Sequence, residues 1–287
     1  MKRESFYYVK KEDFKRLRPQ FTFRILKSSE NVYDSFAREF VDMIKANNSQ
    51  SLKTKVILPV GPLEYRRVAK LCNKENVSCQ NLIIFMMDEY CTEKGEIIPY
   101  NHPLSFHRFM DENFVSLLDE DKRIPKENLI FPDPKDPDSV RERIKDEGGI
   151  DVCYGGFGIN GHFAFNEPPE PGEEVNEDLV RNSTIRVVNL SRETKTALAI
   201  GSTFGNLDLI PPKAVTLGMK ELLSAKEIHL YFMRTWHAGV MRRALFGPID
   251  PTCPASYIQQ HPCVTVTMAS YVAEPPSVNV TQTIGLE

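Results

Sequence analysis

A segment near the middle of the chain, GFGINGHFAFNEP at residues 156–168, gathers side chains that could carry out acid–base chemistry. Within it, Asn160, His162 and Glu167 supply an amide, an imidazole and a carboxylate. An imidazole can take up and return a proton near neutral pH, and a carboxylate on its other ring nitrogen would fix its tautomer. The glycines between these residues permit tight turns and close approach of the backbone to a ligand. We therefore predict a proton-transfer centre built around His162.

Two carboxylates follow a short apolar run in the motif MDEY at residues 87–90. Asp88 and Glu89 come directly after LIIFMM, which has the composition of a buried strand. A carboxylate at a strand end lies in the crevice of an open sheet, and partial desolvation raises its pKa toward the range of a general base. A second interpretation stays open, in which Asp88 only caps a turn.

A third segment, PVGP at residues 59–62, is a turn between a predicted strand and a predicted helix. The free backbone amides of such a turn, around Gly61, could bind a phosphate. Turns of this composition are also common structural elements, so the motif alone does not decide its role. The glycine spacing in residues 155–161 does not match a dinucleotide fingerprint, so we predict no nicotinamide cofactor.

The segments around these motifs alternate between helix and strand patterns. Residues 31–47 carry their apolar side chains on one helical face, which predicts an amphipathic helix. Apolar runs at residues 55–60 and 82–87 flank a helix-like stretch at 64–75. A strand, a helix and a strand in this order, with strands that are apolar throughout, are typical of a parallel sheet covered on both faces.

Similar patterns recur downstream and predict a helix at residues 140–146 and strands near positions 128, 152, 214, 227 and 264. We therefore predict an α/β fold with a doubly wound, mostly parallel sheet flanked by helices. We expect one domain, residues 1–287, with irregular ends at about 1–20 and 270–287. Ligands of such sheets bind at the carboxyl ends of strands, where the three motifs lie. The tract rich in proline and glutamate after Asn166 predicts an exposed loop or flap.

Composition and charge argue against several classes of protein. Lysine and arginine total 36 against 39 acidic residues, for a net charge of −3 without a basic stripe, so we predict no nucleic-acid partner. No apolar run has the length of a signal-peptide core or a membrane span, so we expect a cytoplasmic protein without membrane contact. The six cysteines include no CxxC pair, and His102, His107 and His261 lack metal-site spacing, so we predict free thiols and no metal.

The motif MDEY followed by GxGxNGHxAFNEP resembles the paired signature of the glucosamine-6-phosphate deaminases. The segments HPLSFHRFMDENF at 102–114 and QQHP at 259–262 extend the similarity over most of the chain from Val56 to about Thr267. The resemblance implies an α/β fold shared with sugar-phosphate isomerases and 6-phosphogluconolactonases. It also implies conversion of an amino-sugar 6-phosphate to a ketose 6-phosphate and ammonia, without a metal or an organic cofactor.

The same resemblance assigns expected roles to the residues of the motifs. Asp88 would move a proton between C2 and C1 of the sugar, and His162 would open the pyranose ring. Glu167 would orient His162, while Asn160, where some members have aspartate, could only form hydrogen bonds. The residues that we expect to contact the substrate are Gly61, Glu89, Gly158, Gly161 and His237.

The positions that hold phosphate in the family differ in this chain. The family uses a Gly-Gly-Thr-type loop, an arginine and a lysine, whereas here the loop reads LPVGPLEY, with Ile200 and His237 at the two cation positions. Loss of both cations would remove charge-assisted bonds of about 1.5–3 kcal/mol each. Unless one of three arginines, Arg66, Arg67 or Arg234, replaces them, we expect no tight binding of a 6-phosphate. The substrate would then be a different amino-sugar phosphate, a sugar acid or another derivative whose anionic group is placed elsewhere.

Two other functions remain open from the sequence. A hydrolase like the 6-phosphogluconolactonases shares the fold, but MDEY and the NEP motif are of the deaminase type. A catalytically retired sugar-binding regulator is favoured by the altered phosphate loop and opposed by retention of Asp88, His162 and Glu167. The family ranges from monomers to hexamers, which leaves a homo-oligomer open, and only Arg186 resembles the basic residues of its regulated members.

Overall fold

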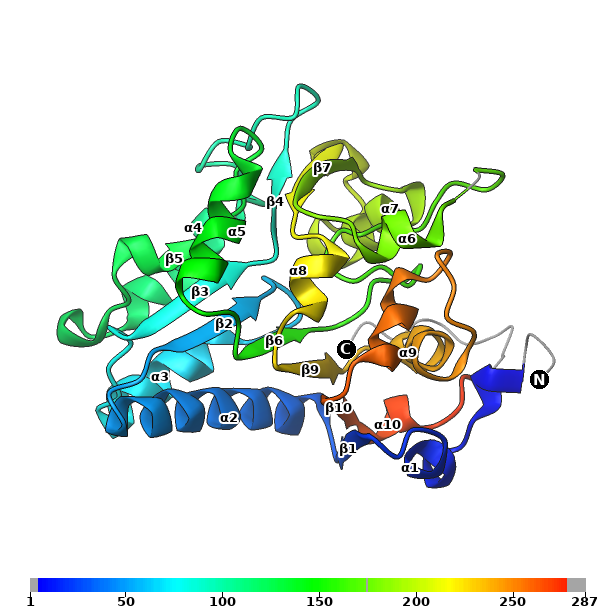
Figure 1. Cartoon of the computed structure of the whole chain (residues 1–287), viewed down its shortest axis with the longest axis horizontal. Coiled ribbons are helices and arrows are strands. Elements are labelled where there is room, and N and C mark those ends of the chain that lie inside the picture. The colour runs from blue at the N-terminus through cyan, green and yellow to red at the C-terminus, as the bar shows by residue number, and fades with distance from the viewer. Residues whose placement is uncertain (1–4, 174, 278–287) are drawn as a thin grey trace.

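The computed structural model, shown in Figure 1, describes residues 5–173 and 175–277. Its centre is a seven-stranded sheet with the order β1-β10-β9-β6-β2-β3-β5, in which every neighbouring pair is parallel. The strands are β1 (Phe21–Leu26), β2 (Thr54–Leu58), β3 (Leu82–Met86), β5 (Leu129–Ile130), β6 (Val152–Gly155), β9 (Glu227–Phe232) and β10 (Val264–Ala269). The predicted parallel α/β sheet is confirmed.

Helices cover both faces of this sheet, and strands β3, β6 and β10 are therefore buried along their whole length. Figure 1 shows α2 (Ser29–Ser49) and α3 (Tyr65–Glu75) on one side, and α5 (Pro137–Asp146) and α8 (Met219–Leu223) on the other. The apolar face predicted for α2 is buried, and the Ser28 hydroxyl accepts a hydrogen bond from the Asn31 amide at its start. The helix–strand alternation read from the sequence therefore places the layers correctly.

A second, three-stranded antiparallel sheet was not predicted. It consists of β4 (Asp88–Cys91), β8 (Lys213–Thr216) and β7 (Arg186–Asn189), with β8 in the middle. The apolar run near position 214 predicted another strand of the main sheet, but it pairs with β4, which continues from β3 after a single residue, Met87. The amide of Leu217 donates to the Met87 carbonyl and fixes this junction. Asp88 thus begins the strand that leaves the main sheet.

The chain ends contain more regular structure than expected. Residues 5–17 form η1 (Ser5–Tyr8), η2 (Lys11–Asp13) and α1 (Phe14–Leu17), followed by the edge strand β1. The fully buried Arg242 accounts for this regular structure. Its guanidinium donates to the carbonyls of Val9, Val272 and Ala273 and so links both chain ends to the helix that carries Arg242. The expected irregular end at 270–287 begins with α10 (Ser270–Ala273), and its residues 278–287 lie outside the described residues.

The remaining helices connect these layers. They are α4 (Phe106–Asn113), α6 (Glu177–Arg181), α7 (Arg192–Ser202), α9 (His237–Phe246), η3 (Val115–Leu117), η4 (Glu120–Lys122), η5 (Lys126–Asn128), η6 (Leu207–Leu209) and η7 (Pro254–Gln260). All six cysteines are free thiols. Among the described residues, no helix is both long enough and apolar enough to cross a bilayer.

Candidate active site

The strand order changes direction beside β2. From β2 the chain runs outward through β3 to β5 and then returns to β6, which pairs with the other edge of β2. In open parallel sheets such a change opens a crevice at the carboxyl ends of the strands. A cavity of about 370 Å3 lies here, lined by the turn after β2, the junction after β3, the loop after β6, helix α7, and Arg234, Trp236 and His237. The fold therefore brings the predicted motifs to one place.

Asp88 forms part of the cavity wall and is largely buried, with 6% of its surface exposed. Its carboxyl group makes no hydrogen bond or ion pair with the described residues. Burial, and secondly the neighbouring charge of Glu89, raise the pKa of Asp88 well above its usual range. A carboxylate in this setting is a stronger base than one in water, which suits transfer of a proton to and from carbon.

Glu89 points away from this cavity because adjacent side chains of a strand alternate between its two sides. It is fully buried and accepts hydrogen bonds from the amides of Phe106 and His107 at the start of α4. The Nδ1 atom of His107 lies 2.8 Å from the same carboxylate. The structure therefore does not bring Glu89 to this cavity, and Glu89 instead anchors the helix whose first residues form one wall.

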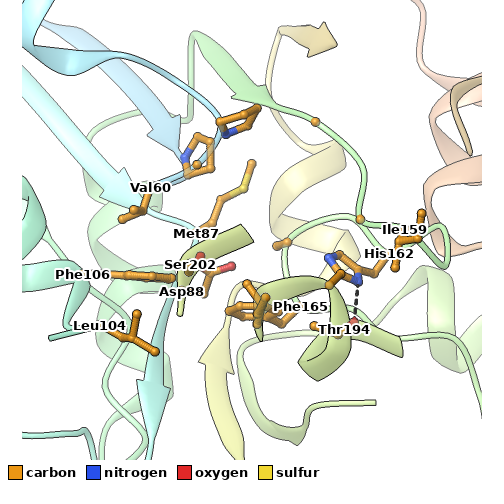
Figure 2. A pocket seen from close by; sticks show the side chains of 18 of the residues that line it. Val60, Met87, Asp88, Leu104, Phe106, Ile159, His162, Phe165, Thr194 and Ser202 are labelled. Atoms are coloured by element: carbon orange, nitrogen blue, oxygen red, sulfur yellow. Dashed lines mark hydrogen bonds between the residues drawn. The ribbon is translucent and has the colours of Figure 1, made fainter. Parts of the chain in front are cut away.

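The imidazole of His162 lines the same cavity as Asp88, and Figure 2 shows its hydrogen bond to Thr194. Nδ1 lies 3.1 Å from the Thr194 hydroxyl and 3.4 Å from a Glu167 carboxylate oxygen. Burial alone would raise the pKa of Glu167, but hydrogen bonds and charge from His162, Asn160 and Thr194 lower it to about 2. Glu167 is therefore ionised at neutral pH and orients the imidazole.

Asn160 holds this carboxylate rather than lining the cavity. Its Nδ2 group donates to Glu167 at 2.7 Å and to the Ser191 hydroxyl at 3.1 Å, while its Oδ1 accepts the His162 amide at 3.2 Å. The Asn160 side chain thus stabilises both the charge of Glu167 and the turn that carries the imidazole. These contacts use the amide as both donor and acceptor, which an ionised aspartate could not do.

Gly158 of the motif makes room for the imidazole, and Gly161 permits the turn that carries it. A methyl group at Gly158 would lie 2.0 Å from the His162 ring, so only glycine leaves room for the imidazole. Gly161 has a φ of +92° and packs against Cys253, where a methyl group would lie 2.6 Å from the sulfur. Gly61 and Gly158 line the cavity, whereas Gly161 does not.

Sequence reasoning missed Ser191 and Thr194, which complete the hydrogen-bond network. Ser191 precedes α7 and its hydroxyl accepts the Thr194 amide, an arrangement typical of a helix N-cap. The sequence contains the signal for this cap, but nothing in it links the cap to an imidazole that lies 32 positions earlier in the chain.

The two positions at which we expected the family's phosphate-binding cations, Ile200 and His237, carry no free cation. His237 is buried, and its Nδ1 accepts the amides of Met233 and Arg234 at 3.1 Å each. Burial, and secondly the charge of Arg234, lower the pKa of His237 well below its usual range, so the ring is neutral. Ile200 does not line the cavity.

Of the three arginines that could substitute, two are engaged elsewhere. Arg66 donates to Asn113, and Arg67 pairs with two carboxylates of α2. Neither lines the cavity, whereas Arg234 does. The described residues contain no group of three or more histidines, cysteines or carboxylates that could hold a metal ion.

Comparison with known proteins identifies the family. No protein-family model matches the chain. The glucosamine-6-phosphate deaminase of Mannheimia succiniciproducens is 33% identical over 248 residues, which cover 82% of this chain and 85% of that protein. The deaminase of Aeromonas hydrophila is 33% identical over 249 residues, covering 83% and 86%. The chain belongs to the glucosamine-6-phosphate deaminase family.

Solved structures agree with this family assignment. The structure of a monomeric glucosamine-6-phosphate deaminase has a TM-score of 0.73 and 27% identity, and covers 88% of this chain and 98% of its own. A 6-phosphogluconolactonase from Thermotoga maritima has a TM-score of 0.60 at 14% identity, covering 87% and 99%. At that identity the lactonase shares the fold alone with this deaminase family member.

Proposed function

We propose that this enzyme converts an amino-sugar 6-phosphate, glucosamine-6-phosphate or a related sugar, to a ketose 6-phosphate and ammonia. Membership of the deaminase family supports the reaction class. The observation that carries the proposal is the pairing, across one cavity, of the buried Asp88 carboxyl with a His162 imidazole held by an ionised Glu167. The two groups divide the chemistry between ring opening and proton transfer at carbon.

Ring opening falls to His162. Its Nδ1 atom is occupied by Thr194 and Glu167, while its Nε2 atom forms no hydrogen bond with the described residues. A protonated imidazole can therefore give the Nε2 proton to the ring oxygen as the bond from C1 to that oxygen breaks, and the neutral Nε2 then takes up the proton of the C1 hydroxyl. The pyranose then opens to the aldehyde, and Glu167 keeps the imidazole in the orientation that the transfer requires.

Proton transfer between carbons falls to Asp88. In the open chain, its carboxylate removes the C2 proton while O1 takes back a proton from the imidazole, which gives an enolamine. The same carboxyl then returns a proton to C1. The C2 imine that results adds water and releases ammonia, leaving the ketose. Apolar residues around Asp88, among them Val60, Leu104 and Phe106, keep the carboxylate poorly hydrated and hence basic (Figure 2).

The alternative of a sugar-binding regulator rests on the neutral His237 and on Ile200 outside the cavity. Retention of the ionised Glu167 beside His162 favours turnover instead, because binding alone does not need an oriented proton donor. The small-molecule substrate is the partner that the proposal names. A cytoplasmic location and a homo-oligomer stay predictions.

The test offers the purified enzyme glucosamine-6-phosphate, galactosamine-6-phosphate and the unphosphorylated parent sugars, and follows ammonia and ketose together. We expect equal amounts of both products from a phosphorylated amino sugar. Binding of the sugars without any product would favour the regulator instead.

The Asp88→Asn variant removes the base while keeping its shape. We expect turnover to fall by at least about 100-fold with little change in substrate affinity, since the amide cannot accept the C2 proton. Asp208→Asn, at an exposed position on η6, is the matched control and should retain wild-type activity. An active Asp88→Asn variant would contradict the mechanism.

A further inference from the structure

One cation at the cavity forms no hydrogen bond or ion pair with the described residues. Arg234 follows β9, is exposed, and lines the cavity beside the start of α9. Its guanidinium lies 5.9 Å from the centre of the Trp236 ring and donates to no acceptor among the described residues. We propose that Arg234 is the residue that binds the substrate's phosphate, an inference that rests on the proposed function.

The guanidinium lies close to α7. A methyl group at Gly201 would lie 3.7 Å from one terminal nitrogen of Arg234, an ordinary contact distance, which places the guanidinium beside this helix. Gly201 directly follows Ile200, the position at which the resemblance to the family leads us to expect an arginine. Arg234 would therefore bring a cation to this region from the segment that follows β9.

Other donors line the same cavity and could complete a phosphate site. The amides of Val60 and Gly61, in the turn after β2, donate no hydrogen bond within the described residues. The hydroxyl of Ser202 belongs to the cavity wall as well. The prolines on either side, Pro59 and Pro62, have no amide hydrogen, so this shortened turn offers few backbone donors and leaves most of the charge neutralisation to an arginine.

No other described residue of the cavity can take this role. Among the residues that line the cavity, Arg234 is the single arginine or lysine, and His237 is neutral. A guanidinium presents a planar fork that matches two phosphate oxygens, and stacking against an aromatic ring limits its motion before the ligand arrives. Trp236 thereby supports the arginine rather than serving only as packing.

The test compares Arg234→Met and Arg234→Lys with wild type, using glucosamine-6-phosphate and glucosamine as substrates and isothermal titration for binding of glucosamine-6-phosphate. Removal of a charge-assisted pair should lower kcat/KM for the phosphorylated sugar, relative to that for glucosamine, by about 10- to 150-fold. We expect most of this loss to come from a higher KM for the phosphorylated sugar. Arg234→Lys should recover part of kcat/KM, because lysine keeps the charge but not the planar fork of the guanidinium.

Arg192→Met is the control, because Arg192 is an exposed arginine on α7 that does not line the cavity. It should behave as wild type, and an equal loss in this variant would refute the role of Arg234. So would an Arg234→Met variant with unchanged KM and unchanged binding. If the wild type binds glucosamine-6-phosphate but releases no ammonia, the proposed function fails. In that case, loss of glucosamine-6-phosphate binding in Arg234→Met would still support Arg234 as the phosphate ligand. If the wild type does not bind the sugar phosphate at all, the assignment is overturned.

Discussion

The charge of Glu167 offers the sharpest test of the site, because the structure gives both the sign and the size of its effect. Replacing Glu167 by glutamine keeps the size of the side chain and removes its charge. The carboxylate receives the Asn160 amide on one oxygen and the Ser191 amide, at 3.3 Å, on the other. Glutamine has one acceptor oxygen and one donor group, so in either orientation a donor faces a donor.

The magnitude follows from the pKa of Glu167, which is lowered from its ordinary 4.5 to about 2. At about 1.4 kcal/mol for each pKa unit, this lowering corresponds to about 3 kcal/mol of stability. Because the folded pKa lies below the unfolded one, the contribution is fully present above about pH 4.5 and is lost as the pH falls toward 2. We therefore expect Glu167→Gln to be less stable than wild type by up to about 3 kcal/mol at pH 7.

Urea unfolding of wild type and Glu167→Gln between pH 7 and about pH 3, followed by circular dichroism, measures this difference. The gap should shrink as the pH falls below 4.5, and Glu142→Gln, on the exposed face of α5, should show no such pattern. In parallel, kcat should fall by about 100- to 10,000-fold, the usual contribution of an oriented proton donor. A stability gap that stays constant from pH 7 to pH 3 would refute the reasoning.

Two further predictions test the packing of the imidazole and a charged cluster far from it. Gly158→Ala should lower kcat by at least about 100-fold, because its methyl group would lie 2.0 Å from the His162 ring and displace it. Gly239→Ala is the control, because the nearest neighbour of its methyl group would lie at 3.9 Å. An active Gly158→Ala enzyme would contradict this geometry. His229 lies between the carboxylates of Glu39, at 2.5 Å, and Glu227, at 2.9 Å. Burial lowers the pKa of His229, but the two carboxylates outweigh burial and raise that pKa. The ion pairs of His229 therefore stabilise the folded state below about pH 6.5, and this stabilisation is lost as the pH rises through the higher pKa of the folded state. The difference in melting temperature between wild type and His229→Gln should therefore narrow from pH 6 to pH 9, and a gap that widens would show that the imidazole is not held as a cation.

Much of the architecture was determined by local patterns in the sequence. Apolar runs such as residues 82–87 predict strands buried on both faces, and the helical face of residues 31–47 predicts a helix packed on the sheet. Because parallel strands end at one edge, the same patterns predict that Asp88 and His162 lie near each other. These inferences need only the periodicity of side chains, which a sequence contains in full.

The tertiary structure decided what adjacent or distant residues do with their side chains. Asp88 and Glu89 are neighbours in the motif, yet strand geometry sends one to the cavity and the other to the start of α4. The Thr194 hydroxyl lies within hydrogen-bond distance of the His162 ring although the two residues are 32 positions apart in the chain. This contact depends on the packing of α7, at whose start Thr194 lies, against the rest of the fold.

The same distinction applies to charge. From the resemblance to the family we predicted that two phosphate-binding cations are replaced, and the sequence offered three arginines that could compensate. Only the folded chain shows that Arg66 and Arg67 are engaged on the surface, that burial makes His237 neutral, and that Arg234 is left at the cavity. Residue type fixes which charges a chain carries, whereas burial and hydrogen-bond partners decide which of them remain charged and free to meet a ligand.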